Sequence, residues 1–365
     1  MGFNCGIVGL PNVGKSTLFN AITAAGAEAS NYPFCTIEPN VGIVPVPDPR
    51  LELLARIYRP ARVVPTTIEF VDIAGLVKGA STGEGLGNQF LSHIRNVDAI
   101  AHVVRCFDNP DVVHVDGSVD PRRDIEVIET ELILKDLETV ERRLADALKR
   151  GKAGDKKARA EADMLARIKD HLGAGRLAHY LTIEHPDEVA LMRDLHLLTR
   201  KPVMYVCNVN EQDIPRGNAH VEVVREVAAR EDALVIAISA AVESEVAELP
   251  PDERAEFLRG LGLEESGLSK VIHEGYALLH LITFFTAGPK EVRAWTVRSG
   301  LRAPEAAGTI HSDFEKGFIR AEVMRFDDLN LCGTEHAVRE RGLLRVEGRE
   351  YVVKDGDVMY VRFAV

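Results

Sequence analysis

The chain predicts an α/β fold built on a mostly parallel sheet, and two observations carry that prediction. From residue 3 to about residue 125, apolar strand-like runs alternate with helical patterns, and the clearest strands are 6–9, 67–72 and 99–105. Strand-like runs return at 202–207 and 234–239. Strands that alternate with helices along a chain form a parallel sheet with helices on its faces. The second observation is a glycine-rich motif at 9–16, directly after the first strand.

This motif, GLPNVGKS, matches G-x-x-x-x-G-K-[ST], the pattern of a phosphate-binding loop, so the α/β unit is predicted to be a P-loop NTPase. It lies between a strand and an amphipathic helix, which is the context that the motif requires. We expect Lys15 to reach the β- and γ-phosphates and Ser16 to bind Mg²⁺. Nucleotide contacts are expected from Asn12, Val13, Gly14, Lys15, Ser16 and Thr17, because the loop glycines let successive backbone N–H groups point at phosphate oxygens. The alternative is a strand-to-helix turn with a chance lysine.

Composition limits the class of protein. The chain has 365 residues, 46% of them hydrophobic, which suggests two or three units with real cores. No apolar stretch approaches the ~20 residues of a membrane span, so we expect no membrane partner. Five widely spaced cysteines, an odd number, indicate reduced thiols in a cytoplasmic protein. The net charge of −12 argues against a protein that coats nucleic acid, and we expect a monomer.

The hydrophobic period changes to three or four residues after about residue 125. Apolar positions at this spacing are Ile133, Leu137, Val140, Leu144 and Leu148, followed beyond a break at 151–157 by Met164, Leu165, Ile168 and Leu172. This predicts a helical hairpin inserted into the α/β unit. Between Arg142 and Arg159 eight basic residues stand against two acidic ones, which places a basic cluster at the tip. The predicted domains are 1–125 with 200–278 for nucleotide binding, 126–199 for the hairpin, and 279–365 for a small α+β domain.

Two further segments complete the predicted phosphate site. Asp72 and Gly75 form D-x-x-G at a strand end, where such an Asp holds Mg²⁺ and the Gly N–H senses the γ-phosphate. Thr36, in the loop between the two motifs, is a candidate switch residue that closes over Mg²⁺. The alternatives are a plain strand-end carboxylate and a solvated loop threonine. The glycine-rich stretch 79–87 is expected to move easily.

The segment that would read the base departs from the GTPase pattern. After the strand 202–207 comes NVNE (208–211), where a GTPase places N-K-x-D. A GTPase Asp accepts from both guanine donors, whereas this chain offers the longer Glu211 and lacks the lysine. Asn208 can still pair with N7 and the 6-amino group of adenine, because an amide both donates and accepts. Val209 belongs to the same segment, and Ser239 and Ala240 resemble the turn that covers the base.

The order GLPNVGKST, NYPFCTIEPNVG, DIAGLVKGAS and NVNE, with the C-terminal segment, resembles the Obg-like ATPases, the YchF group of P-loop proteins. The resemblance covers essentially the whole chain. It implies a nucleotide-binding domain with an inserted hairpin and a C-terminal TGS domain of ubiquitin-like shape. It also implies a preference for ATP over GTP, carried here by Asn208 and Glu211, and association with ribosomes, through ribosomal RNA and protein.

The chain lacks the glutamine that positions the attacking water in a GTPase. Leu76 stands where a GTPase has the Gln that positions the attacking water, and an aliphatic side chain cannot orient water. His114 matches a family histidine that would align the water; an exposed loop histidine is the alternative. Asn12 is a second candidate, because an Asn at this loop position can ligate K⁺ in related proteins. Either way the intrinsic rate should be low.

Three functions remain open from the sequence. The first is a slow ATP-hydrolysing switch that regulates translation or a stress response on the ribosome. The second is an Obg-type GTPase that tolerates the altered base motif. The third is a ribosome-binding module that nucleotide merely stabilises.

Overall fold

A computed structural model describes residues 3–27, 40–73, 86–110, 112, 114–115, 117–183 and 185–364. The nucleotide-binding part of the chain forms a six-stranded sheet of order β2-β4-β1-β5-β6-β7. Its strands are β1 (Asn4–Val8), β2 (Val41–Pro45), β4 (Thr67–Asp72), β5 (Ala99–Arg105), β6 (Val203–Asn208) and β7 (Leu234–Ile238). All neighbouring strands are parallel except β2, which pairs antiparallel with β4. Every residue of the inner strand β5 is buried, which explains its almost wholly apolar sequence.

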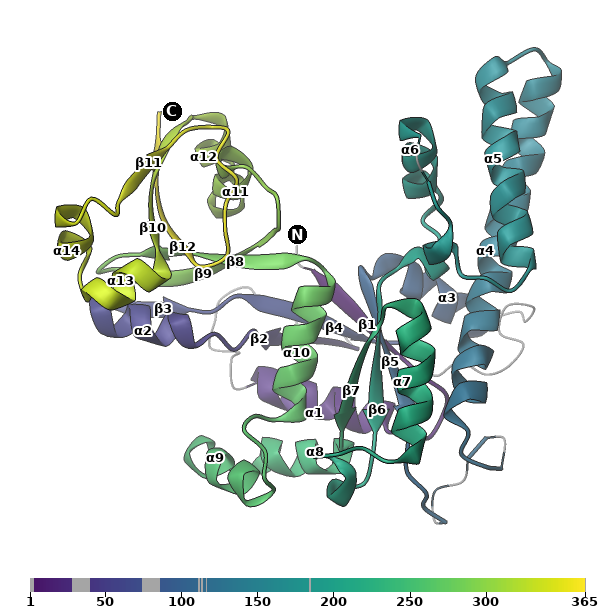
Figure 1. The fold of residues 1–365 in the computed structure, drawn as a ribbon, viewed down its shortest axis with the longest axis horizontal. Helices are drawn as coiled ribbons and strands as arrows, with labels where there is room; N and C mark the ends of the chain where they lie inside the picture. The colour runs from purple at the N-terminus through teal and green to yellow at the C-terminus, as the bar shows by residue number, and fades with distance from the viewer. Residues whose placement is uncertain are drawn as a thin grey trace.

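Helices cover both faces of this sheet (Figure 1). On β6, Met204 and Val206 belong to the same core as α10 (Gly267–Leu278), whereas Tyr205 and Cys207 pack with α7 (Ala219–Glu231). Alternate residues of a strand point to opposite faces, so these two helices lie on opposite sides. The other helices of this part are α1 (Lys15–Ala27), α3 (Leu86–Asn96), α8 (Ala240–Glu248) and α9 (Pro251–Gly260).

The predicted hairpin consists of α4 (Pro121–Lys152) and α5 (Lys156–Gly173). Each helix is capped by an aspartate, Asp120 and Asp155, whose side chain accepts from first-turn N–H groups. The first half of α4 packs on the sheet and its second half packs on α5, so one helix of 32 residues serves both units. The chain returns through η1 (Ala178–Tyr180), α6 (Pro186–Leu195) and η2 (Leu198–Arg200).

A buried carboxylate fastens the end of the hairpin to α4. Asp136 is fully buried, and its oxygens accept hydrogen bonds from the backbone N–H groups of Leu198 and Thr199, both at 2.8 Å, and from Thr199 Oγ1 at 2.7 Å. Burial raises the pKa of Asp136, and these hydrogen bonds act in the opposite direction. The three donors fix where β6 begins relative to the hairpin.

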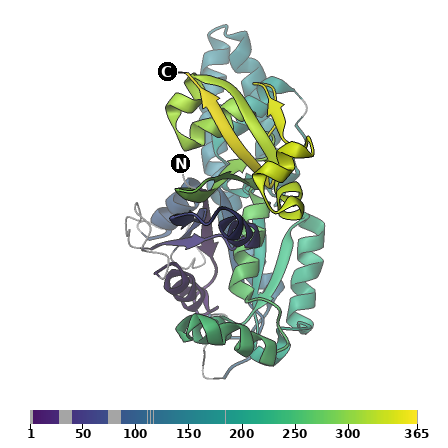
Figure 2. The same ribbon diagram turned by 90° about the vertical axis from the view of Figure 1, so that its left-hand side faces the viewer.

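The C-terminal residues form a second sheet of order β11-β10-β12-β8-β9-β3. Its strands are β3 (Arg62–Val64), β8 (Leu281–Ala287), β9 (Glu291–Arg298), β10 (Phe318–Arg325), β11 (Arg345–Glu347) and β12 (Asp357–Phe363). Helices α11 (Ala303–Ile310), α12 (Ser312–Lys316), α13 (Phe326–Cys332) and α14 (Glu335–Glu340) accompany it. The hairpin and this unit project toward the same end of the molecule (Figures 1 and 2).

One strand and one helix from the N-terminal region belong to this second unit. β3 pairs in parallel with β9, and α2 (Pro49–Tyr58) buries Leu51 and Leu54 in the same core as Phe285. Residues 49–64, which the predicted boundaries place in the nucleotide-binding domain, therefore complete the C-terminal sheet. The apolar face of α2 has its partner more than two hundred residues further along the chain.

No helix of the described residues is long and apolar enough to cross a membrane. Cys5, Cys106 and Cys207 are buried free thiols, and Cys332 is a partly buried one. Burial raises the pKa of the Cys5 thiol to about 12, which keeps it protonated and unreactive.

Candidate nucleotide-binding site

The glycine-rich loop joins β1 to α1 at the carboxyl edge of the first sheet. Its turn uses left-handed backbone at Asn12 (φ 64°) and Gly14 (φ 95°). The Gly14 carbonyl accepts from the Leu18 N–H at 3.0 Å, which starts the helix. A Cβ on Gly14 would lie 2.1 Å from Asn208 Nδ2, so a side chain is excluded by both backbone and space.

Two predicted site residues meet at this edge. β1 and β4 are neighbours with Ile7 opposite Asp72, and Lys15 Nζ forms an ion pair with the Asp72 carboxylate. The side chains of Lys15 and Asp72 are 9% and 18% exposed, so both lie in a partly closed site. Ser16 and Thr17 lie in the first turn of α1 with exposed side chains. The carboxylate and the Ser16 hydroxyl are hard oxygen donors, the kind that Mg²⁺ prefers.

Asn208 at the end of β6 connects two loops of the predicted base site. Its Nδ2 donates to the Val13 carbonyl at 2.9 Å, and its Oδ1 accepts from the Ala240 N–H at 3.0 Å. The side chain is buried, so these hydrogen bonds hold the phosphate loop against the start of α8. Sequence reasoning missed this structural role, although an Asn that ends a buried strand was a signal. An amide has a second N–H and a second lone pair, so contact with a base remains open.

The other predicted base residues surround Asn208. The Val209 N–H donates to the Ile238 carbonyl at 2.8 Å, which continues the pairing of β6 with β7. Ser239 is the N-cap of α8. Glu211 begins a short helix, η3 (Glu211–Asp213), and is exposed, so its carboxylate can reach a ligand at the rim.

His114 is buried, so the alternative of an exposed loop histidine is wrong. Its Nε2 lies 2.9 Å from Asp124 Oδ2, and both side chains are 3% exposed. Asp124 lies in the first turn of α4, where Arg123 also contacts its other oxygen at 3.0 Å. The pair orients the imidazole ring through a carboxylate, as in many general bases.

Arg105 holds the loop that carries His114. The residue is 2% exposed, and its guanidinium group donates to the carbonyls of Phe107, Asn109 and Val112. Sequence reasoning missed this residue. The signal was a charged side chain at the end of a strand that is otherwise nearly all apolar.

Several predicted residues lie outside the described part of the chain: Thr36, Gly75, Leu76 and most of 79–87. Their predicted roles stay predictions. Among the residues that the structure does describe, no three metal-ligating side chains form a cluster. Asp72 and Ser16 offer two oxygens, so the rest of a Mg²⁺ shell there would come from water and from a bound nucleotide.

The mostly parallel sheet, the glycine-rich loop at its carboxyl edge and the Lys15–Asp72 pair together define a nucleotide-binding protein of the P-loop NTPase fold. A family model described as "50S ribosome-binding GTPase" matches residues 4–149. A second model, of the YchF C-terminal domain and described as "Protein of unknown function", matches residues 281–364. These matches agree with the predicted fold class.

Similar proteins cover the whole chain. "Ribosome-binding ATPase YchF" of Haemophilus influenzae is 56% identical over 365 residues, 100% of both chains. "Obg-like ATPase 1" of Rattus norvegicus is 47% identical over 98% of this chain and 91% of its own. The solved "Structure of the Schizosaccharomyces pombe YchF GTPase" matches with a TM-score of 0.89 and 40% identity, over 99% of this chain and 98% of that one. The chain belongs to the YchF family, which confirms the resemblance and the fold class predicted from the sequence.

Proposed function

We propose that this protein is a ribosome-associated ATPase that binds ATP in preference to GTP and hydrolyses it slowly as a regulatory switch. The observation that supports it most is the departure of the base segment, Asn208 to Glu211, from the GTPase pattern beside an intact phosphate loop. The names of similar proteins differ on the nucleotide, since the H. influenzae protein is named an ATPase and the S. pombe one a GTPase. The base segment of this chain is therefore the better guide.

The proposed selection of ATP rests on the hydrogen-bond donors and acceptors of the two bases and of the base segment. Guanine presents two donors on its Watson–Crick edge, and a GTPase Asp accepts both. Here the exposed Glu211 is one methylene longer, and no lysine stem packs on the base. Adenine needs one acceptor for its amino group, which the remaining lone pair of Asn208 Oδ1 supplies.

Hydrolysis would use few groups. Lys15 would neutralise charge on the β- and γ-phosphates, and Mg²⁺ held by Ser16, Asp72 and Thr36 would supply further positive charge to the phosphates. His114 would position the attacking water in place of the missing Gln. The Asp124 carboxylate, 2.9 Å from Nε2, would hold the ring in one orientation. K⁺ at Asn12 is the second candidate for neutralising developing charge.

The alternatives make different predictions. An Obg-type GTPase would bind GTP at least as tightly as ATP, which nucleotide competition measures. A nucleotide-stabilised module would show no turnover, even with ribosomes present. The proposed switch hydrolyses ATP with the purified protein alone, and ribosome binding depends on which nucleotide is bound.

The hairpin tip is the proposed contact with ribosomal RNA. Not all of its basic side chains are free: Glu161 accepts from Arg143 at 2.6 Å and from Arg150 at 2.5 Å. Arg159 donates to the Gly151 carbonyl at 3.0 Å. The exposed positive charge left for phosphates comes chiefly from Lys152, Lys156 and Lys157, and from Lys149, whose ammonium group lies 3.9 Å from the Asp146 carboxylate. A solvated helical turn is the simpler explanation of such a tip.

Reversal of these four lysines to glutamate should weaken co-sedimentation with ribosomes and flatten its salt dependence. Each neutralised phosphate contributes about 0.9 to the slope of log affinity against log salt on a duplex, so the loss of four contacts should lower the slope by roughly 3.6. The matched control reverses four exposed basic residues of the nucleotide-binding part: Arg216, Arg230, Arg259 and Lys270. A tip variant that pellets like the parent at every salt concentration would move the interface elsewhere, first to the C-terminal unit.

A further inference from the structure

A cavity of about 460 Å³ opens at the edge of the first sheet opposite to the phosphate loop. It is lined by Ile100 and His102 near the start of β5 and by Val203 and Tyr205 near the start of β6. The phosphate loop follows the end of β1 and Asn208 ends β6, both at the opposite edge of the sheet. The volume falls within the ~300–1,000 Å³ range of small-molecule sites. This cavity is therefore separate from the nucleotide site.

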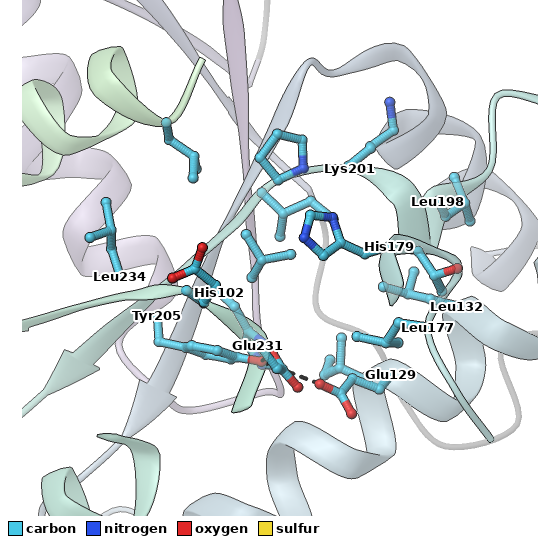
Figure 3. A pocket seen from close by; sticks show the side chains of 18 of the residues that line it. His102, Glu129, Leu132, Leu177, His179, Leu198, Lys201, Tyr205, Glu231 and Leu234 are labelled. Carbon is cyan, nitrogen blue, oxygen red and sulfur yellow. Dashed lines mark hydrogen bonds between the residues drawn. The ribbon is translucent and has the colours of Figure 1, made fainter. Parts of the chain in front are cut away.

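Two carboxylates and a hydroxyl meet inside it. Tyr205 Oη lies 2.5 Å from Glu231 Oε2 at the end of α7 and 3.2 Å from Glu129 Oε1 on α4 (Figure 3). The hydroxyl has one hydrogen for two carboxylates, so the cluster lacks a donor. Burial, and then the charge of Glu231, raises the pKa of Glu129 to about 8. At neutral pH a proton shared by the two carboxylates supplies the missing donor, and a bound cationic donor would replace that proton.

His102 is an independent sign of a ligand. It is 4% exposed and lies opposite Tyr205 in the register of β5 and β6, with the two rings 5.5 Å apart. Across the described ranges of the chain, neither of its ring nitrogens has a hydrogen-bond partner, although the side chain lines the cavity. Burial lowers the pKa of His102 to about 4, so at neutral pH one ring nitrogen is a free acceptor. The ring therefore offers an acceptor to a donor that is bound in the cavity.

The remaining lining decides the charge and shape of the ligand. Asp232 and Glu274 add negative charge. The one lysine, Lys201, is turned away and donates to the backbone carbonyls of Arg95 and Val97 (Figure 3). One side of the cavity is apolar, with Leu132, Leu177 and Leu198 together and Glu129 beside them (Figure 3). Because the described residues offer no cluster of three metal ligands here, a metal ion fits less well than an organic cation.

We propose that this cavity binds a protonated primary amine with an apolar body, whose ammonium group lies between Glu129 and Glu231. The three N–H donors of such a group match the acceptors that the cavity offers, the two carboxylates and the free nitrogen of His102. The apolar body lies against the leucine wall, and the Tyr205 ring adds a face that attracts cations.

Calorimetric titration with three probes of one shape tests the proposal: 2-phenylethylamine, 2-phenylethanol and 3-phenylpropionate. The amine should bind at least tenfold more tightly than the alcohol, and the carboxylate should not bind. Glu129→Gln and Glu231→Gln should each weaken the amine at least tenfold, whereas Glu256→Gln, an exposed control on α9, should leave it unchanged. Thermal unfolding of each variant checks that it is folded.

A second readout is proton release. Titrations of the amine at pH 7 in buffers of different ionisation enthalpy should show protons leaving the carboxyl pair, and Glu129→Gln should abolish the release. The other titratable groups that face the pair are Glu126 on α4, Tyr205 on β6, His102 on β5, Asp232 after α7, His179 and Tyr180 on η1, Lys201, and Glu274 and His280 at the end of α10. Equal binding of amine and alcohol, no binding of any probe, or unchanged amine affinity in both glutamine variants would overturn the proposal.

Discussion

Replacement of Lys15 by alanine should abolish tight binding of nucleoside triphosphates and leave the fold intact. In the structure the Lys15 ammonium group pairs with the Asp72 carboxylate at the edge of the sheet, and the side chain makes no contribution to the apolar core. Hydrogen bonds to charged groups contribute about 1.5–3 kcal/mol each, and two lost phosphate contacts weaken binding roughly a hundredfold to ten-thousandfold. Turnover should fall with the affinity.

Calorimetric titration with ATP measures this loss, and thermal unfolding measures the fold. Lys270→Ala is the matched control, because this lysine is exposed on α10 and should leave ATP affinity unchanged. If Lys15→Ala hydrolyses ATP as fast as the parent, the activity belongs to a contaminant or to another site. A large fall in the unfolding temperature would instead make the Lys15–Asp72 pair a structural element.

His114→Ala should lower the single-turnover rate of ATP hydrolysis, with ATP affinity nearly unchanged. A positioned proton-accepting or water-orienting group contributes typically 10²–10⁴-fold to a rate, so a fall of about a hundredfold is expected. Removal of a group that acts only in the transition state lowers the rate and leaves ground-state binding as it was. The low starting rate makes single-turnover measurement necessary.

The control is His220→Ala, since His220 also faces an aspartate, Asp108 at 3.5 Å, but is more exposed. Its rate should match the parent. His114→Ala also leaves the buried Asp124 without one partner, so thermal unfolding must accompany the kinetics. A folded His114→Ala protein with the parental rate would show that His114 only stabilises the start of α4, and attention would pass to Asn12.

Local sequence signals were enough to predict the sheet and the phosphate loop. The predicted strands 67–72 and 99–105 have the bounds of β4 and β5, because β4 alternates buried apolar residues with more exposed ones and β5 is buried throughout. The spacing of Gly9, Gly14 and Lys15 likewise fixes a loop whose geometry depends on neighbouring residues. The strands and the loop can be predicted from the sequence because the interactions that determine them lie within a few residues.

Contacts between distant segments could not be read in this way. α2 and β3 pack on strands beyond residue 280, and nothing in residues 49–64 names that partner. The burial of His114 depends on Asp124 and Arg105, which belong to different elements. Asn208 was read as a base contact, whereas its two described hydrogen bonds join the phosphate loop to α8. In each case the missing information is a tertiary contact.

The hydrogen-bonding groups of the base segment bear directly on the choice between ATP and GTP. Asn208 is held in place by Val13 and Ala240, so its second lone pair and second N–H have a fixed direction. Glu211 is exposed and longer than the Asp of a GTPase, so we expect the pair of hydrogen bonds that selects guanine to be lost. A lost pair of this kind contributes roughly 1–3 kcal/mol, or about ten- to a hundredfold in affinity.

Calorimetric titration of the purified protein with ATP and with GTP, under identical Mg²⁺ and salt, tests this claim most directly. We expect ATP to bind about ten- to a hundredfold more tightly than GTP. Glu211→Asp combined with Val209→Lys should narrow this difference in affinity, because these changes restore the guanine-reading pattern N-K-x-D. GTP bound as tightly as ATP by the parent protein would contradict the account and favour the Obg-type GTPase.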